Sequence, residues 1–113
     1  MGKRGSKLTS GTVEAGAAFV ARIGAVGEVT TRKMFGGLGI FESGTMFGIV
    51  DSNGKIFLRG GPVNEARFEE AGSVRHGKMP YFSIPDEVLT DDAATVEWAT
   101  LAVHAGHQAK KNR

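Results

Sequence analysis

The segment Arg32-Lys33-Met34-Phe35-Gly36-Gly37-Leu38-Gly39-Ile40-Phe41 places three glycines among large apolar residues, where an ordinary strand carries β-branched side chains. Two structures fit the Gly36-Gly37 pair: a two-residue hairpin turn, or a bulge that bends one long strand running from Thr30 to Phe41. Glycines inside a strand often mark bulges and close backbone approach, so we favour the bent strand. We expect Gly36 or Gly37 to have a positive φ, or to oppose a large side chain that leaves no room for a Cβ.

Outward from this segment, the chain continues as strands joined by short turns. Residues 45–50 and 55–59 are rich in Val, Ile, Phe and Thr, and they are bounded by Ser43-Gly44 and Asp51-Ser52-Asn53-Gly54. These are turn sequences, because Gly and Asn accept positive φ and Asp and Ser side chains bond to nearby backbone. Connections of hairpin length imply an antiparallel sheet.

Three helices are predicted around these strands. The first begins near Ser10, a good N-cap residue, and ends at Gly24, and the second covers residues 62–71. The third begins at Asp91-Asp92, whose side chains cap it and complement its dipole. Its apolar face predicts that Trp98 is buried between this helix and the sheet; the face consists of Trp98, Leu101, Ala102 and Ala105.

Residues 73–78 and 79–84 predict a short second hairpin, with Pro80 at a strand start because it cannot donate to the ladder. The order is therefore α-β-β-β-α-β-β-α. This order predicts an α+β fold, a two-layer sandwich with an antiparallel sheet and helices on one face. We expect a disordered basic leader over residues 1–9, a single domain over 10–108 and a basic tail over 109–113.

Composition limits the class of protein. A chain of 113 residues fits one domain, and 41% hydrophobic residues are enough for one core. No apolar run approaches the roughly 20 residues that a membrane-spanning helix needs, and the N-terminus leads into no signal-peptide core. The chain has no cysteine, which excludes disulfides and thiolate metal sites and suits a cytoplasmic location.

The net charge of +2 hides an uneven distribution. Six of the 14 basic residues lie in the tails, which leaves eight basic residues against 12 acidic ones within residues 8–109. A folded body that binds nucleic acid normally carries a basic patch, so we expect this chain alone to bind no specific DNA sequence. Any phosphate contact would come from the tails and weaken with salt. The tail residues are Lys3, Arg4, Lys7, Lys110, Lys111 and Arg113.

No motif for catalysis, cofactor binding or metal binding is found. The glycines of the first segment have strand on both sides, whereas a phosphate-binding loop leads into a helix N-terminus. His104 and His107 are three residues apart but lack a third ligand nearby, so we interpret them as surface residues. The chain contains no Gly-x-Ser-x-Gly nucleophile elbow.

A small interaction or anion-binding patch is the main candidate site, and it consists of Arg32, Arg59 and Tyr81. Arg32 and Lys33 point to opposite faces of a strand, so at most one of them joins Arg59. Aromatic residues are common at interfaces, which makes Tyr81 a candidate contact. The methionines and phenylalanines at 34–35 and 46–47 are expected mainly in the core, although a face rich in Met and Phe also suits protein binding.

Motifs between residues 29 and 105 resemble the TfoX N-terminal domain, the family of Sxy-type regulators of bacterial competence. The resemblance implies a fold like that of secretion chaperones and a role in the transcription of DNA-uptake genes, together with a cyclic-AMP-responsive activator. Full regulators of this type carry a second domain after this one. The resemblance rests on Met34-Phe35-Gly36-Gly37, Gly39, Met46-Phe47, Phe57-Leu58-Arg59, Arg67-Phe68, Ala71-Gly72, Met79-Pro80-Tyr81 and Trp98.

These observations predict a non-enzymatic, cytoplasmic regulatory or protein-interaction module. Its partner is expected to be another protein, such as a transcription activator, or a second copy of the chain, bound through the sheet face or a strand edge. Two alternatives remain open: a protein that associates weakly with nucleic acid through its tails, and a small ligand-binding or enzymatic domain with a pocket near Gly36-Gly37. The motif residues with an expected structural role are Met34, Phe35, Gly36, Gly37, Gly39, Met79, Pro80 and Trp98.

Overall fold

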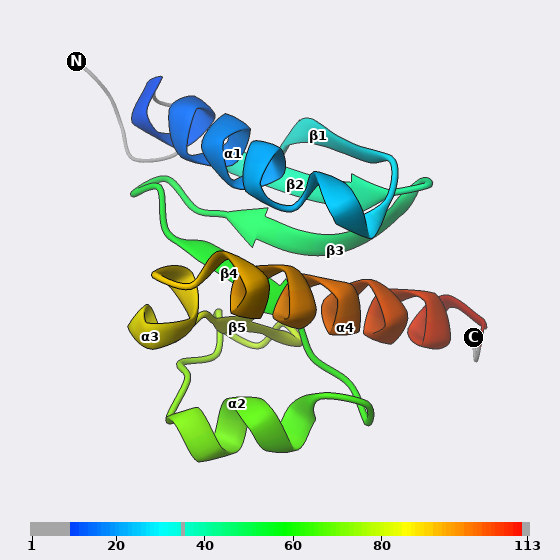
Figure 1. Cartoon of the computed structure of the whole chain (residues 1–113). Coiled ribbons are helices and arrows are strands. Elements are labelled where there is room, and N and C mark those ends of the chain that lie inside the picture. The colour runs from blue at the N-terminus through cyan, green and yellow to red at the C-terminus, as the bar shows by residue number, and fades with distance from the viewer. Residues whose placement is uncertain (1–9, 35, 112–113) are drawn as a thin grey trace.

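The computed structural model describes residues 10–34 and 36–111, so the leader predicted for residues 1–9 and the side chain of Phe35 lie outside the described residues. Figure 1 shows how the helices and strands are arranged. None of the helices in these two ranges is long and apolar enough to cross a membrane. The elements are α1 (Ser10–Arg22), η1 (Gly24–Val26), β1 (Val29–Met34), β2 (Gly37–Glu42), β3 (Thr45–Val50), β4 (Ile56–Arg59), α2 (Glu65–Ala71), β5 (Tyr81–Ser83), α3 (Asp86–Leu89) and α4 (Asp92–Lys111).

The five strands form one sheet in the order β1-β2-β3-β4-β5, and each neighbouring pair is antiparallel. The α+β class and the antiparallel sheet are therefore confirmed. The strands are divided differently from the prediction, since four strands precede α2 and one follows it. This difference arises at the two glycines of the first segment and in the segment before β5.

The chain reverses direction between Met34 and Gly37, so the predicted bent strand from Thr30 to Phe41 is wrong and the hairpin is correct. β1 ends at Met34, β2 begins at Gly37, and these two residues are paired across the hairpin. Gly36 has a φ of 80°, as a tight hairpin turn requires. A Cβ on Gly37 would lie 2.1 Å from the carbonyl oxygen of Val50, so no side chain fits there. The expected positive φ is thus confirmed at Gly36, whereas the group that excludes a Cβ at Gly37 is a backbone carbonyl and not the expected large side chain.

The second predicted hairpin is reduced to one short strand. β5 covers Tyr81–Ser83, and the segment before it contributes only an isolated bridge between Arg75 and Phe82. Pro80 lies directly before β5, and its carbonyl oxygen accepts a hydrogen bond from the backbone N–H of Gly60 at 2.8 Å. The proline is thus at the strand start, where its missing N–H costs the ladder nothing.

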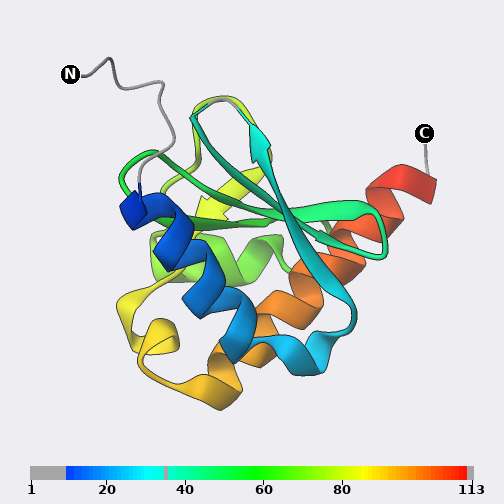
Figure 2. The same cartoon turned by 90° about the horizontal axis from the view of Figure 1, so that it is seen from above.

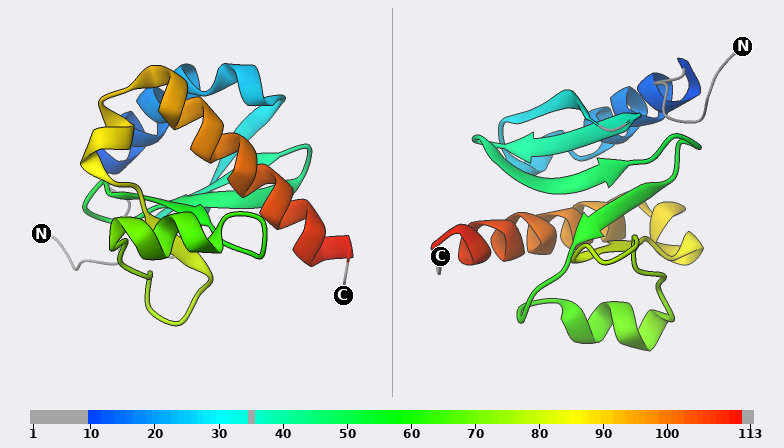
Figure 3. Two further views of the ribbon diagram at one scale, coloured as in Figure 1. Left: turned by 60° about the horizontal axis from the view of Figure 1, so that its bottom comes forward. Right: turned by 180° about the vertical axis from the view of Figure 1, so that it is seen from behind.

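α1 and α4 cover the same face of the sheet, as Figure 2 shows. In the right-hand view of Figure 3, from behind, β4 passes in front of α4. The hydrophobic core lies between these two layers, and burial of its apolar side chains supplies most of the driving force for folding. It includes Phe19 and Ile23 of α1, Ala99 and Ala102 of α4, and Leu38, Ile40, Val50 and Leu58 of the sheet.

Trp98 packs differently from the prediction. Its ring contacts the edge of Phe68 in α2, with the ring centroids 5.3 Å apart, and Phe68 in turn stacks on Phe82 at 5.0 Å. Phe68 is 1% exposed, whereas Trp98 is only partly buried. Trp98 therefore joins α4 to α2 and is not enclosed between α4 and the sheet.

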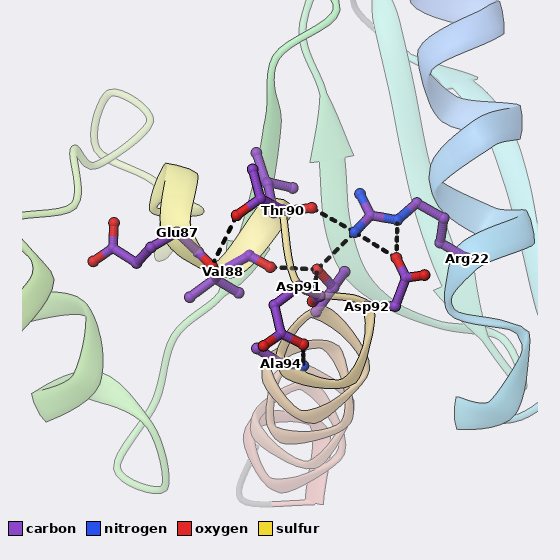
Figure 4. Close-up of polar contacts among 9 residues, drawn as sticks. Arg22, Glu87, Val88, Thr90, Asp91, Asp92 and Ala94 are labelled. Carbon is purple, nitrogen blue, oxygen red and sulfur yellow. Dashed lines mark hydrogen bonds and ion pairs between the residues drawn. The ribbon is translucent and has the colours of Figure 1, made fainter.

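The start of α4 is fixed by polar contacts with α1 and α3 (Figure 4). Arg22 of α1 pairs with Asp92 at 3.0 Å and also donates to the carbonyl oxygen of Leu89. Asp91 caps the helix as predicted, because its carboxylate accepts a hydrogen bond from the backbone N–H of Ala94 at 3.1 Å. These contacts hold α1, α3 and α4 together on one side of the sheet.

Candidate functional site

The opposite side of the sheet carries no helix among the described residues, and we call it the helix-free face. Strand register defines its residues, because side chains two positions apart on a strand share a face. One row across the five strands consists of Arg32, Gly39, Ile49, Phe57 and Ser83. Further along the strands, this face also carries Met34, Phe41, Met46, Arg59 and Tyr81.

A bulge in β3 determines which side chains reach this face. Ile40 pairs with Gly48 and Phe41 pairs with Met46, so Phe47 is left without a partner on β2. The extra residue changes the alternation. Phe47 is fully buried in the hydrophobic core, while Met46 pairs with Phe41 on the helix-free face. The prediction that both residues belong mainly to the core therefore holds for Phe47 and fails for Met46.

Three methionines from distant parts of the chain line one apolar groove on this face. A Cβ on Gly39 would lie 2.5 Å from the Sδ of Met34 and 2.9 Å from the Sδ of Met46, so the two thioethers occupy the space that a side chain would fill. Met79 and His76, from the segment before β5, line the same groove, whose volume is about 280 Å³. We call this the methionine groove.

The segment before β5 forms one wall of the methionine groove. The ring of His76 packs edge-on against Phe57 of β4, with the centroids 4.7 Å apart. The Nδ1 of His76 is buried and has no hydrogen-bond partner. The sequence suggested only a turn at His76-Gly77, because nothing in the local pattern shows that the loop folds back over the sheet.

A second cavity adjoins the methionine groove at Met46, which lines both. It has a volume of about 520 Å³ and is lined by Arg59, Tyr81 and Lys110, together with Gly44, Thr45, Gly106 and Ala109. We call it the basic pocket. The phenol of Tyr81 lies 3.5 Å from the carbonyl oxygen of Met46, a long hydrogen bond. Burial raises the pKa of Tyr81, and the neighbouring Arg59 opposes that shift.

Cations lie over aromatic rings at three places on the helix-free face. The guanidinium carbon of Arg32 is 4.7 Å from the ring centroid of Phe41. The Nζ of Lys55 is 5.7 Å from the ring centroid of Phe57, and the guanidinium carbon of Arg59 is 5.7 Å from that of Tyr81. Such contacts favour a cation above the ring face. The three rings are 9%, 5% and 3% exposed, so the surface presents the cations and not the rings.

The predicted anion-binding patch is only partly assembled. Arg59 and Tyr81 are direct neighbours across β4 and β5 and share the basic pocket. Arg32 lies on the same face, as the alternation of Arg32 and Lys33 allowed. It is on β1, however, three strand spacings or roughly 14 Å from β4. Lys110 and Met46 complete the pocket in its place, and sequence reasoning did not select them for it.

His107 was interpreted as a surface residue, but it has a specific partner. Its Nε2 lies 2.7 Å from the carboxylate of Glu42, which joins the end of α4 to β2. This hydrogen bond lowers the pKa of Glu42, with a smaller contribution from the Ser43 hydroxyl. His104 is exposed. Within residues 10–34 and 36–111, no three His, Asp or Glu side chains are grouped as a metal site requires.

Some of the residues behind the family resemblance lie at these two cavities, whereas Phe47, Leu58 and Phe68 lie in the hydrophobic core. Met34, Gly37, Met46 and Met79 line the methionine groove, and Gly39 leaves space for it. Tyr81 lines the adjoining basic pocket. Trp98 lies elsewhere, between α4 and α2. The fold and these cavities define a small α+β domain with two adjoining cavities at an open sheet.

Comparison with known proteins identifies the family. The family model described as the TfoX N-terminal domain matches residues 21–106, most of the chain, and the protein belongs to this family. Over 50 residues the chain is 44% identical to the DNA transformation protein TfoX1 of Aliivibrio fischeri (strain ATCC 700601 / ES114). That alignment covers 44% of this chain and 23% of the relative. The chain therefore matches less than a quarter of the length of TfoX1.

Proposed function

We propose that this chain is a non-enzymatic protein-interaction module that regulates genes for DNA uptake. The observation that carries the proposal is the methionine groove. Methionine side chains are flexible and polarizable, so a groove lined with them adapts to the apolar side chains of a partner. Met34, Met46 and Met79, which belong to the motifs behind the family resemblance, line this groove, and this supports a binding role.

Membership of the TfoX N-terminal domain family and the similarity to a DNA transformation protein support the competence role. Regulation in this proposal works through a protein partner in the cytoplasm, such as a transcription activator. The family name alone gives no partner. We place the contact on the helix-free face because the opposite face is occupied by α1 and α4.

The test is to replace the chromosomal gene in the host cell with a Met46→Lys variant. A charged side chain in the methionine groove should repel an apolar partner and reduce both the transcription of DNA-uptake genes and the transformation frequency. Met46→Leu, which keeps an apolar side chain of similar volume, should retain both. Arg67→Gln, on α2 away from the groove, serves as the control. Circular dichroism of each purified variant establishes that it is folded.

The proposal fails if folded Met46→Lys supports normal transcription and transformation. It also fails if deletion of the gene changes neither. A loss of activity in the Arg67→Gln control would show that the phenotype does not depend on the helix-free face.

A further inference from the structure

The methionine groove and the basic pocket adjoin at Met46, and the basic pocket extends from the helix-free face to the end of α4, which contributes Gly106, Ala109 and Lys110. Both cavities include Met46, and they follow β3 from Thr45 at one end to Asp51 at the other. A strand rises about 3.3 Å per residue, so this length fits an extended segment of roughly five to seven residues. The surface therefore has an apolar section and a cationic section in a fixed order.

The cationic section has no acidic partner of its own. Arg59 donates through Nε to the carbonyl oxygen of Gly60, and none of the ion pairs among the described residues involves Arg59 or Lys110. By contrast, Arg22 and Arg67, on helices, are paired with Asp92 and Glu97. The cations at the basic pocket are thus available to an external anion.

The methionine groove contains one carboxylate from the described residues, at the end far from the basic pocket. Oδ1 of Asp51 accepts hydrogen bonds from the backbone N–H groups of Asn53 and Lys55, both at 2.9 Å. Lys55 also lies over Phe57, beside the same end. Arg32 lies over Phe41 on the neighbouring flank. Two cations, Lys55 and Arg32, therefore lie beside the groove, whereas its described lining residues include Asp51 as their one charged side chain.

We infer that this surface binds an extended acidic and apolar segment of the partner protein. A large aliphatic side chain of that segment enters the methionine groove between Met34, Met46 and Met79. A carboxylate of the same segment reaches the basic pocket and pairs with Arg59 and Lys110. The inference rests on the proposed function and adds the chemistry of the partner to it.

The same observations disfavour nucleic acid on this face. Proteins bind single strands by stacking bases on exposed aromatic rings, and the rings of Phe41, Phe57 and Tyr81 are almost fully buried. A phosphate backbone also offers no aliphatic side chain for a groove lined with thioethers. Charge complementarity therefore favours a carboxylate-bearing peptide.

The test uses the full chain with methionines labelled by ¹³C at the methyl group, because three of its four methionines line the groove. The probe is a synthetic 12-residue peptide of alternating Asp and Leu. Matched probes are alternating Asp and Ser, alternating Lys and Leu, and a 12-nucleotide oligothymidine. Methyl signals are assigned by single Met→Leu substitutions, and titrations follow their shifts.

The expected result is a saturable shift of the Met34, Met46 and Met79 signals with the Asp-Leu peptide. Binding of each matched probe should be weaker by about tenfold or more, which corresponds to one lost class of contact. Arg59→Gln should lower the affinity for the Asp-Leu peptide by about fivefold, because one partly exposed charge pair contributes on that scale. Arg67→Gln, a cation of the helix side, should leave binding unchanged.

Other results overturn the inference. Equal or tighter binding of the Lys-Leu peptide or of oligothymidine would show that the partner chemistry is wrong. Methyl shifts that depend only on protein concentration would assign the groove to a second copy of this chain. Absence of binding with every probe would also contradict the inference that this surface binds an acidic and apolar segment. If Met46→Lys still abolished DNA-uptake transcription in cells, the proposed function would stand with a partner of different chemistry.

Discussion

At the scale of single residues, Gly37 is the position where the backbone allows no side chain. Its missing Cβ would lie 2.1 Å from a backbone oxygen, and backbone cannot rotate away as a side chain can. Gly37→Ala should therefore lower the free energy of unfolding by about 1–3 kcal/mol through overpacking, measured by urea titration. Gly24→Ala is the control, because a Cβ there meets open space and should change stability by less than about 0.5 kcal/mol. Equal stability of the two variants would contradict the steric argument.

The contact between Glu42 and His107 makes part of the stability depend on pH. The hydrogen bond from His107 lowers the pKa of folded Glu42 below its ordinary value of 4.5. Between these two pKa values the unfolded chain binds more protons than the folded one, so stability falls as the pH falls. The contribution is fully present above pH 4.5 and is lost as the pH drops through the lowered pKa.

Unfolding free energies of the wild type and of Glu42→Gln, measured at a series of acidic pH values, test this. The wild type should be the more stable protein at pH 6, and the difference should shrink as the pH falls below 4.5. Two parallel curves over that range would show that the pair contributes no pH-dependent stability.

At the scale of elements, α2 is held to the rest of the molecule mainly through one ring. Phe68 is buried between Phe82 and Trp98, whereas the acidic side chains of α2 are exposed. Phe68→Ala should cost about 3–5 kcal/mol of unfolding free energy, because it leaves a cavity between three elements. Trp98→Ala should cost less, since Trp98 is only partly buried. Glu69→Ala, in the same helix, should be near neutral.

Chemical unfolding of these three variants measures which substitution lowers the free energy of unfolding most and which least. If Trp98→Ala is as destabilising as Phe68→Ala, the tryptophan has the central role that the helical pattern suggested. The pattern correctly placed Trp98 beside the apolar face of α4. It could not show that the neighbouring surface belongs to α2 and not to the sheet.

The strands show the same limit of local sequence. Every strand-forming segment before α2 was recognised from its Val, Ile, Phe and Thr content and from its turn residues. The Gly36-Gly37 pair fits a bulge and a hairpin equally well in local terms. The pairing of Met34 with Gly37 decides for the hairpin, and the close approach of Val50 to Gly37 is a contact between segments distant in the sequence. Gly48 follows the bulge at Phe47, but one glycine within a strand does not locate a bulge, so the position of Met46 on the helix-free face was missed.

At the scale of the whole molecule, the charges are sorted by layer. Eight of the 12 acidic residues lie within α1, α2, α3 and α4, whereas Arg32, Lys55 and Arg59 extend from the helix-free face. The sequence count showed only that acids outnumber bases between residues 8 and 109. A count cannot show this separation, because it depends on which element covers which face of the sheet. The patch predicted from the sequence, Arg32, Arg59 and Tyr81, therefore included Arg32, which lies far from the basic pocket, and left out Lys110 and Met46, which line it.

This separation sharpens the question of DNA binding. The acidic helix side should repel duplex DNA, and the helix-free face offers a few cations but no helix or ribbon that enters a major groove. We predict no sequence-specific binding by this chain alone. Weak binding at about 50 mM salt should disappear near 200 mM, because each neutralised phosphate makes the affinity fall more steeply with salt. Fluorescence anisotropy of a labelled duplex at both salt concentrations measures this.

The source of any low-salt binding is found by removing charges in separate groups. Deletion of residues 1–8 removes three tail cations, and the pair Lys111→Gln and Arg113→Gln removes two more without changing Lys110 of the basic pocket. If the tails hold the DNA, the two changes together should abolish low-salt binding, while Arg59→Gln alone should weaken it only slightly. The opposite pattern, with strong dependence on Arg59, would place DNA on the helix-free face. Tight binding that survives both 200 mM salt and removal of these tail charges would show that the fold itself contacts DNA. That result would contradict the proposed protein-interaction module.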